Sequence, residues 1–388
     1  MRSTEFFDKA MFDKTVEFYD AKDLGYTGMQ SDSPLIRTIF FDSEMYKGKP
    51  TKVFAYLGIP DHKDGEKLPA VVLVPGGNNA AYECWVRQWV EKGYVAITMD
   101  LSGRYPSNAA KFEGDIKECK SHEFAGPFHD GYDVISPKED AWMYHAVCGV
   151  IYAHNIVRSL SCVDIEKVGI IGNSWGGVIT CTAIGVDNRF NFAVPVYGCG
   201  YLFEERTSKY KLMTMDKKEW DPSEFLKETT VPTFWINGDR DGNFDISVFT
   251  KSARVVRGES MMAIKPNYRH SHQRMWDDAP ELYSYVDWKV KGGAPLITFE
   301  EIEVSEGKAK VKVNIPLGRE LKEIKLVSHS SDDIAYYDAP EPSISSVDGE
   351  LTDDEFSAVV PDDAKRFYIY ARDNDCNTTS TFLYEIEA

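Results

Sequence analysis

The 388-residue sequence predicts an α/β fold with a mostly parallel, doubly wound sheet, followed by a smaller all-β, sandwich-like domain. Two observations lead to this prediction. Short apolar runs recur between residues 71 and 236 and alternate with segments of helix length, as in parallel sheets that are buried on both faces. Beyond residue 295 the pattern changes to strict alternation of apolar and polar side chains, which is typical of antiparallel strands with one wet face.

Five apolar runs carry the prediction of a parallel sheet. They span residues 71–74, 94–99, 168–171, 192–196 and 232–236. Segments of helix length separate or follow them, at residues 82–92, 139–160 and 280–291. Consecutive parallel strands need such crossovers, which are right-handed in nearly all proteins. The runs therefore indicate one wound sheet with helices on both faces.

The tail supplies the evidence for a second domain. Residues 308–315 alternate strictly, and residues 367–371 and 381–386 are strand-like, with turn residues between them. The sequence Lys291-Gly292-Gly293-Ala294-Pro295 has the composition of a joint. We therefore predict an α/β domain with an N-terminal extension over residues 1–294 and a β-sandwich-like domain over residues 295–388.

The net charge of −18, from 44 basic and 62 acidic residues, excludes several function classes. An acidic surface repels phosphate backbones and anionic lipid headgroups, so we expect neither nucleic-acid nor membrane partners. No apolar run approaches the roughly 20 residues that a membrane helix needs. The tail holds 21 acidic and 9 basic residues, a net charge of −12, which leaves −6 for residues 1–294. Most of the charge therefore belongs to the tail.

The N-terminus and the cysteines predict a cytoplasmic protein. The first residues contain no apolar stretch of signal-peptide length, and the seven cysteines form no CxxC pair. Reduced thiols are then the expectation. A polar stretch at residues 107–140 holds several His, Asp and Glu side chains without HxH or HExxH spacing. We expect no metal and no cofactor, and we interpret this stretch as an insertion that covers the mouth of a site.

The sequence Gly172-Asn173-Ser174-Trp175-Gly176-Gly177 is the most informative motif. It follows the apolar run 168–171 directly and opens a segment of small residues, which is the strand, sharp turn and helix of a G-x-S-x-G elbow. An isolated motif is equally consistent with a serine that only caps a helix. Its position after a buried strand favours Ser174 as a nucleophile, with the Trp175 amide as an oxyanion donor.

A serine nucleophile needs a base, and in this arrangement the acid and then the histidine follow the serine along the chain. Only His270, His272 and His329 come after Ser174, and we expect His329 at the surface of the tail. His270 is the preferred base, because its segment precedes the helix predicted at residues 280–291. His272 is the alternative base and otherwise a substrate contact.

The acid is expected in the turn after the apolar run 232–236. Asp241 is preferred there and Asp239 is the alternative, since either residue also suits a turn. The turn Pro75-Gly76-Gly77-Asn78-Asn79 is the expected source of the second oxyanion donor, with the Gly77 amide preferred and Asn78 next. Asn78 and Tyr197 are further candidates for substrate contacts.

With these segments in view, the chain resembles α/β-hydrolases of the dienelactone hydrolase and acetyl xylan esterase group, with prolyl-oligopeptidase-like hydrolases as wider relatives. The resemblance covers roughly residues 35–292 and rests on the elbow, the Gly-Gly turn, and the stretches at residues 85–87, 93–100, 139–146, 187–190 and 194–200. It implies Ser174, Asp241 and His270 as nucleophile, acid and base of a metal-free acyl transfer. The sequence departs from the group at Pro75-Gly76, where its members commonly have His-Gly.

Three functional hypotheses follow. The first is a serine carboxylesterase that removes acetyl or another small acyl group from a small-molecule or oligosaccharide ester. The second is a prolyl-oligopeptidase-like peptidase or a dienelactone-type hydrolase, although an N-terminal region of some 65 residues is too short for a propeller. The third is a catalytically inert scaffold that binds carbohydrate or protein. A homo-oligomer formed through the tail is a separate hypothesis.

Overall fold

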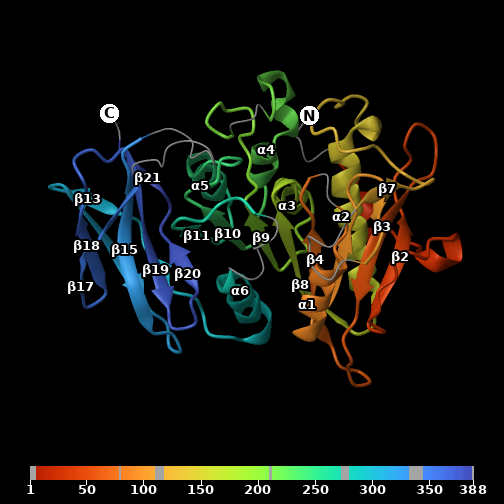
Figure 1. Cartoon of the computed structure of the whole chain (residues 1–388), viewed down its shortest axis with the longest axis horizontal. Helices are drawn as coiled ribbons and strands as arrows, with labels where there is room; N and C mark the ends of the chain where they lie inside the picture. Colours follow the sequence, from red (N-terminus) through yellow and green to blue (C-terminus); the bar gives the residue numbers. More distant parts are fainter. Residues whose placement is uncertain are drawn as a thin grey trace.

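The computed structural model describes residues 6–77, 80–109, 118–208, 212–271, 279–331 and 344–386. In these residues fourteen strands form one sheet that runs through the whole molecule (Figure 1). Strands β5, β4, β8, β9, β10 and β11 lie side by side and parallel, which confirms the predicted α/β fold with a mostly parallel sheet. The strands that the α/β part contributes to this sheet are β1 (Phe18–Asp20), β2 (Ile36–Asp42), β3 (Lys52–Gly58), β4 (Leu68–Val74), β5 (Val95–Met99), β8 (Val163–Asn173), β9 (Phe192–Val196), β10 (Thr233–Gly238) and β11 (Ser260–Lys265). A separate hairpin is formed by β6 (Arg104–Pro106) and β7 (Cys119–Ser121).

Helices cover both faces of the sheet. Helices α1 and α6 lie on one face, whereas α2, α3 and α5 lie on the other (Figure 1). Helix α3 is buried along most of its length, because it packs between α2, α4 and the strands β8 and β9. None of the helices in the described ranges is both long and apolar enough to span a membrane. The helices are α1 (Glu83–Glu91), α2 (Trp142–Ser159), α3 (Trp175–Val186), α4 (Pro222–Leu226), α5 (Ile246–Arg254) and α6 (Pro280–Lys291).

The C-terminal region is rich in antiparallel strands, as predicted. Two layers enclose a core of their own, to which Val311, Phe356, Phe367 and Ile369 contribute. One layer consists of β12 (Thr298–Phe299), β13 (Glu303–Ser305), β14 (Lys308–Asn314), β17 (Glu350–Thr352) and β18 (Glu355–Val359). The other consists of β15 (Leu321–His329), β16 (Ile344–Val347), β19 (Arg366–Asp373), β20 (Thr378–Ser380) and β21 (Tyr384–Glu385). This second layer continues the central sheet, because β20 pairs with β11 in an antiparallel direction. We call residues 295–386 the C-terminal module.

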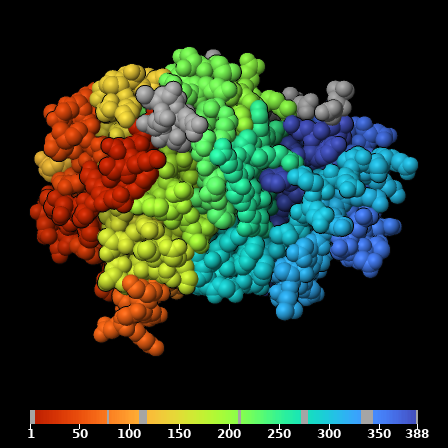
Figure 2. Space-filling view, turned by 180° about the vertical axis from the view of Figure 1, so that it is seen from behind, coloured from red at the N-terminus to blue at the C-terminus, as the bar shows by residue number. Residues whose placement is uncertain are grey.

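Strand β19 departs from the predicted pattern of one wet face. Residues 366–371 are all buried, whereas β14 keeps the expected alternation of buried and exposed side chains. Phe367 and Ile369 face the core of the C-terminal module, and Tyr368 and Tyr370 join the core of the α/β part. The space-filling view shows the blue C-terminal module directly against the teal segment that precedes it (Figure 2). The second face of β19 is dry because it covers the α/β part.

Arg319 fastens the predicted joint. Its guanidinium donates to the carbonyl oxygens of Ala294 and Pro295, both at 2.9 Å. It also forms ion pairs with Asp375 at 2.8 Å and Asp373 at 3.3 Å, and its side chain is 5% exposed. One buried cation therefore ties the start of the C-terminal module to the turn between β19 and β20.

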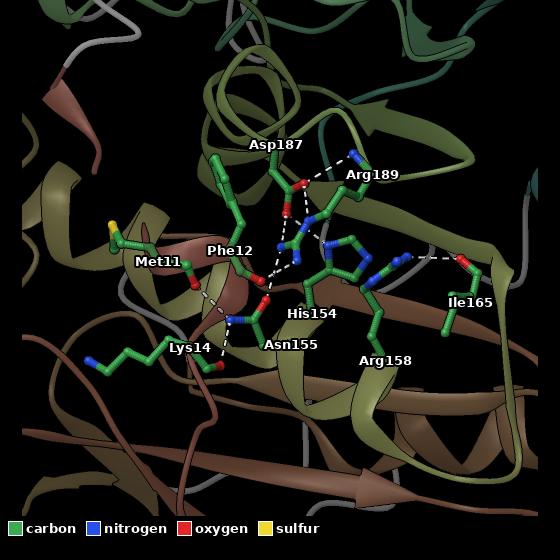
Figure 3. Close-up of polar contacts among 9 residues, drawn as sticks. All are labelled: Met11, Phe12, Lys14, His154, Asn155, Arg158, Ile165, Asp187 and Arg189. Atoms are coloured by element: carbon green, nitrogen blue, oxygen red, sulfur yellow. Dashed lines mark hydrogen bonds and ion pairs between the residues drawn. The ribbon is translucent and has the colours of Figure 1, made fainter. Parts of the chain in front are cut away.

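A buried polar network holds the N-terminal segment against α2 and the end of α3 (Figure 3). The Asp187 carboxylate accepts hydrogen bonds from Arg189 at 2.7 and 2.8 Å and lies 2.9 Å from His154 Nδ1. Arg189 also donates to the Phe12 carbonyl at 2.6 Å, and Asn155 donates to the Met11 carbonyl at 2.8 Å. Burial by itself would raise the pKa of Asp187, but the bonds from Arg189 and His154 outweigh it and hold the pKa below its ordinary range.

We predict that Asp187→Asn lowers the free energy of unfolding at pH 7 by about 3 kcal/mol, because it leaves a half-buried guanidinium without its counter-charge. The depressed pKa means that this stabilisation is present above about pH 4 and is lost as the pH falls further. Urea unfolding at pH 7 and at pH 3 measures both effects. Glu355→Gln, which breaks the exposed pair with Lys310, is the control and changes stability by less than about 0.5 kcal/mol. Equal effects of the two substitutions would contradict the prediction.

Candidate active site

Ser174 lies in a strained turn between the end of β8 and the start of α3. Its φ of 58° and ψ of −120° are unusual for a residue with a side chain. The turn forms because its neighbours lack side chains: a Cβ on Gly176 would collide with the Val74 carbonyl oxygen, and one on Gly172 would collide with the Gly176 carbonyl oxygen. The Ser174 amide donates to the Val196 carbonyl at 2.8 Å. Neighbouring strands thus fix the backbone that presents the Ser174 hydroxyl.

The structure brings Ser174, His270 and Asp241 into one hydrogen-bonded chain. His270 Nε2 lies 3.0 Å from Ser174 Oγ, and His270 Nδ1 lies 2.9 Å from Asp241 Oδ2. An ionised carboxylate only accepts hydrogen bonds, so the Nδ1 proton points to Asp241 and Nε2 is left to accept from the serine. The side chains of His270 and Asp241 are 7% and 0% exposed. This geometry permits a proton to pass from Ser174 to His270.

Asp241 is held by its own turn. Its Oδ1 accepts hydrogen bonds from the amides of Asn243 at 2.7 Å and Phe244 at 3.1 Å. Asp239, the alternative acid, instead accepts a bond from Tyr368 Oη at 3.0 Å. His329 is buried rather than exposed, because it lies on β15 where the C-terminal module meets the α/β part, and burial lowers its pKa to about 3.

Gly77, the predicted oxyanion donor, lies beside the elbow. A Cβ on Gly77 would collide with the Trp175 ring and would lie 2.9 Å from His129 Nε2. The Trp175 ring packs edge-on against His129 at 5.1 Å and Trp142 at 5.7 Å, and it also contacts Tyr132. Burial lowers the pKa of His129 to about 4, so its ring is neutral at pH 7. His129 thus places an uncharged ring beside the predicted oxyanion turn.

Of the three predicted substrate contacts, only Tyr197 lies within the described residues. Asn78 and His272 lie outside the described residues. Tyr197 is fully buried, with φ of 58°, and its ring lies 4.9 Å from the His270 ring and stacks on Tyr268. Tyr197 therefore packs against the His270 ring in the interior of the protein, away from solvent.

A cavity of about 400 Å³ opens beside the Ser174 hydroxyl. Leu212 and Phe244 give it an apolar wall, and neither residue was predicted, because both lie in loops without a recognisable motif. Within the described ranges, no three His, Cys, Asp or Glu side chains lie close enough together to hold a metal ion. The described residues that line the cavity are Ser174, Trp175, Ser208, Leu212, Asn243, Phe244, His270 and Ser271.

Two solved structures have the same overall fold. The acetyl xylan esterase from Paenibacillus sp. R4 superposes with a TM-score of 0.54 and 16% identity, over 72% of this chain and 91% of that one. Acetyl xylan esterase 1 from Thermoanaerobacterium sp. JW/SL YS485 gives a TM-score of 0.50 and 14% identity, over 71% and 90%. At these identities the likeness is evidence for the fold alone.

Sequence comparison identifies the family. Acetyl esterase Axe7A of Xylanibacter ruminicola is 23% identical over 224 residues, which are 52% of this chain and 49% of that protein. The uncharacterized peptidase YuxL of Bacillus subtilis is 20% identical over 244 residues, 57% of this chain and 34% of that protein. The chain thus spans half or less of the length of these relatives. The family model for acetyl xylan esterase (AXE1) matches residues 3–219. Since this match covers more than half of the sequence, the chain belongs to the acetyl xylan esterase (AXE1) family of α/β-hydrolases.

Proposed function

We propose that this chain is a serine carboxylesterase that removes acetyl or another small acyl group from a carbohydrate or a similar alcohol. The observation that carries the proposal is the continuous hydrogen-bonded chain from Ser174 Oγ through His270 to Asp241. Family membership supports an ester as the substrate class. The acetyl preference rests on the relatives that are named acetyl esterases.

In the first half of the reaction, His270 Nε2 takes the Ser174 proton while Oγ attacks the ester carbonyl carbon. The negative charge that develops on the carbonyl oxygen is stabilised by the amides of Gly77 and Trp175, the latter at the N-terminus of α3. His270 then passes its proton to the departing alcohol oxygen. The carbon–oxygen bond of the ester breaks and an acyl group remains on Ser174.

In the second half, water replaces the alcohol. His270 takes a proton from the water, the resulting hydroxide attacks the acyl carbon, and the proton returns to Ser174 Oγ as the acid leaves. Asp241 stays ionised throughout and stabilises the transient imidazolium. Tyr197 packs against His270 and so acts by holding its ring rather than by touching the substrate.

The cavity accounts for how an ester is received. Leu212 and Phe244 offer an apolar surface beside Ser174, where an acyl group would displace water. The cavity is partly open to solvent, as binding of an ester with a bulky alcohol requires. A peptidase, a dienelactone-type hydrolase and an inert scaffold are the competing functions that the following experiment separates.

A fluorophosphonate probe and a substrate panel test the proposal. We expect the probe to label Ser174, identified by peptide mass spectrometry, and p-nitrophenyl acetate and acetylated xylan to be hydrolysed. Ser174→Ala abolishes labelling, and His270→Ala lowers the acylation rate at least about 10⁴-fold. His272→Ala is the matched control from the same segment and retains much of the activity.

Each competing function has its own outcome. Cleavage of a Pro-containing peptide without ester turnover would indicate the peptidase. A dienelactone as the sole substrate would indicate the dienelactone-type hydrolase. Absence of labelling at Ser174 would indicate the catalytically inert scaffold. Loss of acylation in His272→Ala but not in His270→Ala would reverse the assignment of the base.

We predict that Gly77→Ala lowers kcat by about 10²-fold with little change in KM, because the added Cβ displaces the turn that donates to the oxyanion. Steady-state kinetics with p-nitrophenyl acetate measure the effect. Gly149→Ala in α2 is the control, since its Cβ meets only Val53 at an ordinary 3.9 Å. A Gly77→Ala enzyme with unchanged kcat would exclude this turn as an oxyanion donor.

A further inference from the structure

Two polar side chains of β19 reach the loop that carries Asp241. Arg366 Nη1 lies 2.8 Å from Asp245 Oδ1, and the Tyr368 hydroxyl donates to Asp239 Oδ2 at 3.0 Å. All four side chains are buried, with exposures between 0% and 4%. The C-terminal module therefore holds this loop two residues before Asp241 and four residues after it.

Strand geometry explains why these two residues face the loop together. Successive side chains of a strand point to opposite faces, so Phe367 and Ile369 enter the core of the module while Arg366 and Tyr368 turn away from it. A buried guanidinium is costly unless a counter-charge meets it. Asp245 supplies that charge to Arg366, and neutral His329 in the same interface adds none. The face of β19 thus complements the charge of the loop.

The same loop is joined to the segment that carries the base. Asp239 accepts a hydrogen bond from the backbone of Asn267, and the Arg240 amide donates to the Tyr268 carbonyl at 3.2 Å. These contacts lie two and three residues before His270. A shift of Asp239 would consequently move the acid and the base relative to each other.

The C-terminal module also supports the base segment directly. Glu281 of α6 is fully buried, forms an ion pair with Lys265 at the end of β11, and accepts the amide of Thr378 at 3.2 Å. The Ile264 amide donates to Ser380 Oγ at 2.9 Å. Strand β20 thus fixes the end of β11, from which the chain continues to the catalytic base.

We propose that Tyr368, with Arg366, is a positioning residue of the triad, so that the C-terminal module completes the active site without touching the substrate. The proposal rests on the proposed esterase function. Tyr368 holds Asp239, Arg366 holds Asp245, and together they set the loop so that Asp241 meets His270 at hydrogen-bond distance. A small displacement of catalytic groups by remote contacts is enough to cost about 10²-fold in rate.

Tyr368→Phe in the full-length protein tests the proposal, because it removes one hydroxyl and keeps the ring. We expect kcat for p-nitrophenyl acetate to fall about 10- to 100-fold with KM within about twofold. The rate of fluorophosphonate labelling should fall by the same factor. Tyr370→Phe is the matched control: Tyr370 lies on the same face of β19 and bonds to Glu323 instead of the catalytic loops, so its kcat stays unchanged.

The pH profile separates positioning from loss of stability. Burial raises the pKa of Asp239 to about 6, and Tyr368, the Asn267 amide, Arg240 and Arg366 oppose the rise. Without the tyrosine hydroxyl the pKa rises further, so kcat of Tyr368→Phe should gain a dependence on an ionisation near neutral pH. This dependence should be absent in the double variant Tyr368→Phe with Asp239→Asn.

Several results would overturn the proposal. Equal kcat values for Tyr368→Phe and Tyr370→Phe would do so, and so would a Tyr368→Phe defect that vanishes on cooling well below its unfolding temperature. In both cases wild-type labelling at Ser174 would leave the proposed function standing. Failure of the wild-type protein to label or to hydrolyse any ester would instead refute the function and the positioning role together.

Discussion

The proposed active site depends on backbone contacts that only glycine allows. At the end of β8, Gly176 lies against the Val74 carbonyl and Gly172 against the carbonyl of Gly176, so that strand β4, strand β8 and helix α3 meet without intervening side chains. Ser174 takes its strained backbone conformation inside this contact. Because parallel strands end at one edge of the sheet, the loops after β4, β10 and β11 bring Gly77, Asp241 and His270 to the same place.

The strands that carry these features are local, and the sequence predicts them well. The run 168–171 lies inside β8, and residues 192–196 are β9 itself, because strands buried on both faces are written as uninterrupted apolar runs. The antiparallel strands β2 and β3 lie outside the five predicted runs, although β3 also holds a buried apolar run that ends at a glycine. Strand β19 is a mixed case: its position was predicted, but not that its second face is dry. Nothing in residues 366–373 tells which other part of the chain will cover them.

The choice between Asp239 and Asp241 shows the same limit more sharply. Both residues follow a buried strand and both suit a turn, so local pattern leaves them nearly equal. In the structure, Asp239 is engaged by Tyr368, which follows it by 129 residues, while Asp241 faces His270. The distribution of net charge between the two parts of the chain shows the same limit. The C-terminal module is strongly acidic overall, yet it meets the catalytic loop through an arginine and a tyrosine, because that loop itself carries the buried carboxylates.

The contacts of β19 with the loop that carries Asp241 have a consequence for biosynthesis. Arg366 and Tyr368 leave the ribosome about 125 residues after Asp241, which at about 5 to 20 residues per second is a delay of roughly 6 to 25 seconds. During this interval the elbow and the parallel strands are already synthesised, but the two side chains that bond Asp239 and Asp245 are not. On the proposed positioning role, the nascent chain acquires its nucleophile early and its finished acid loop late, so the last 10- to 100-fold of the hydrolytic rate is added only when the C-terminal strands have joined the sheet.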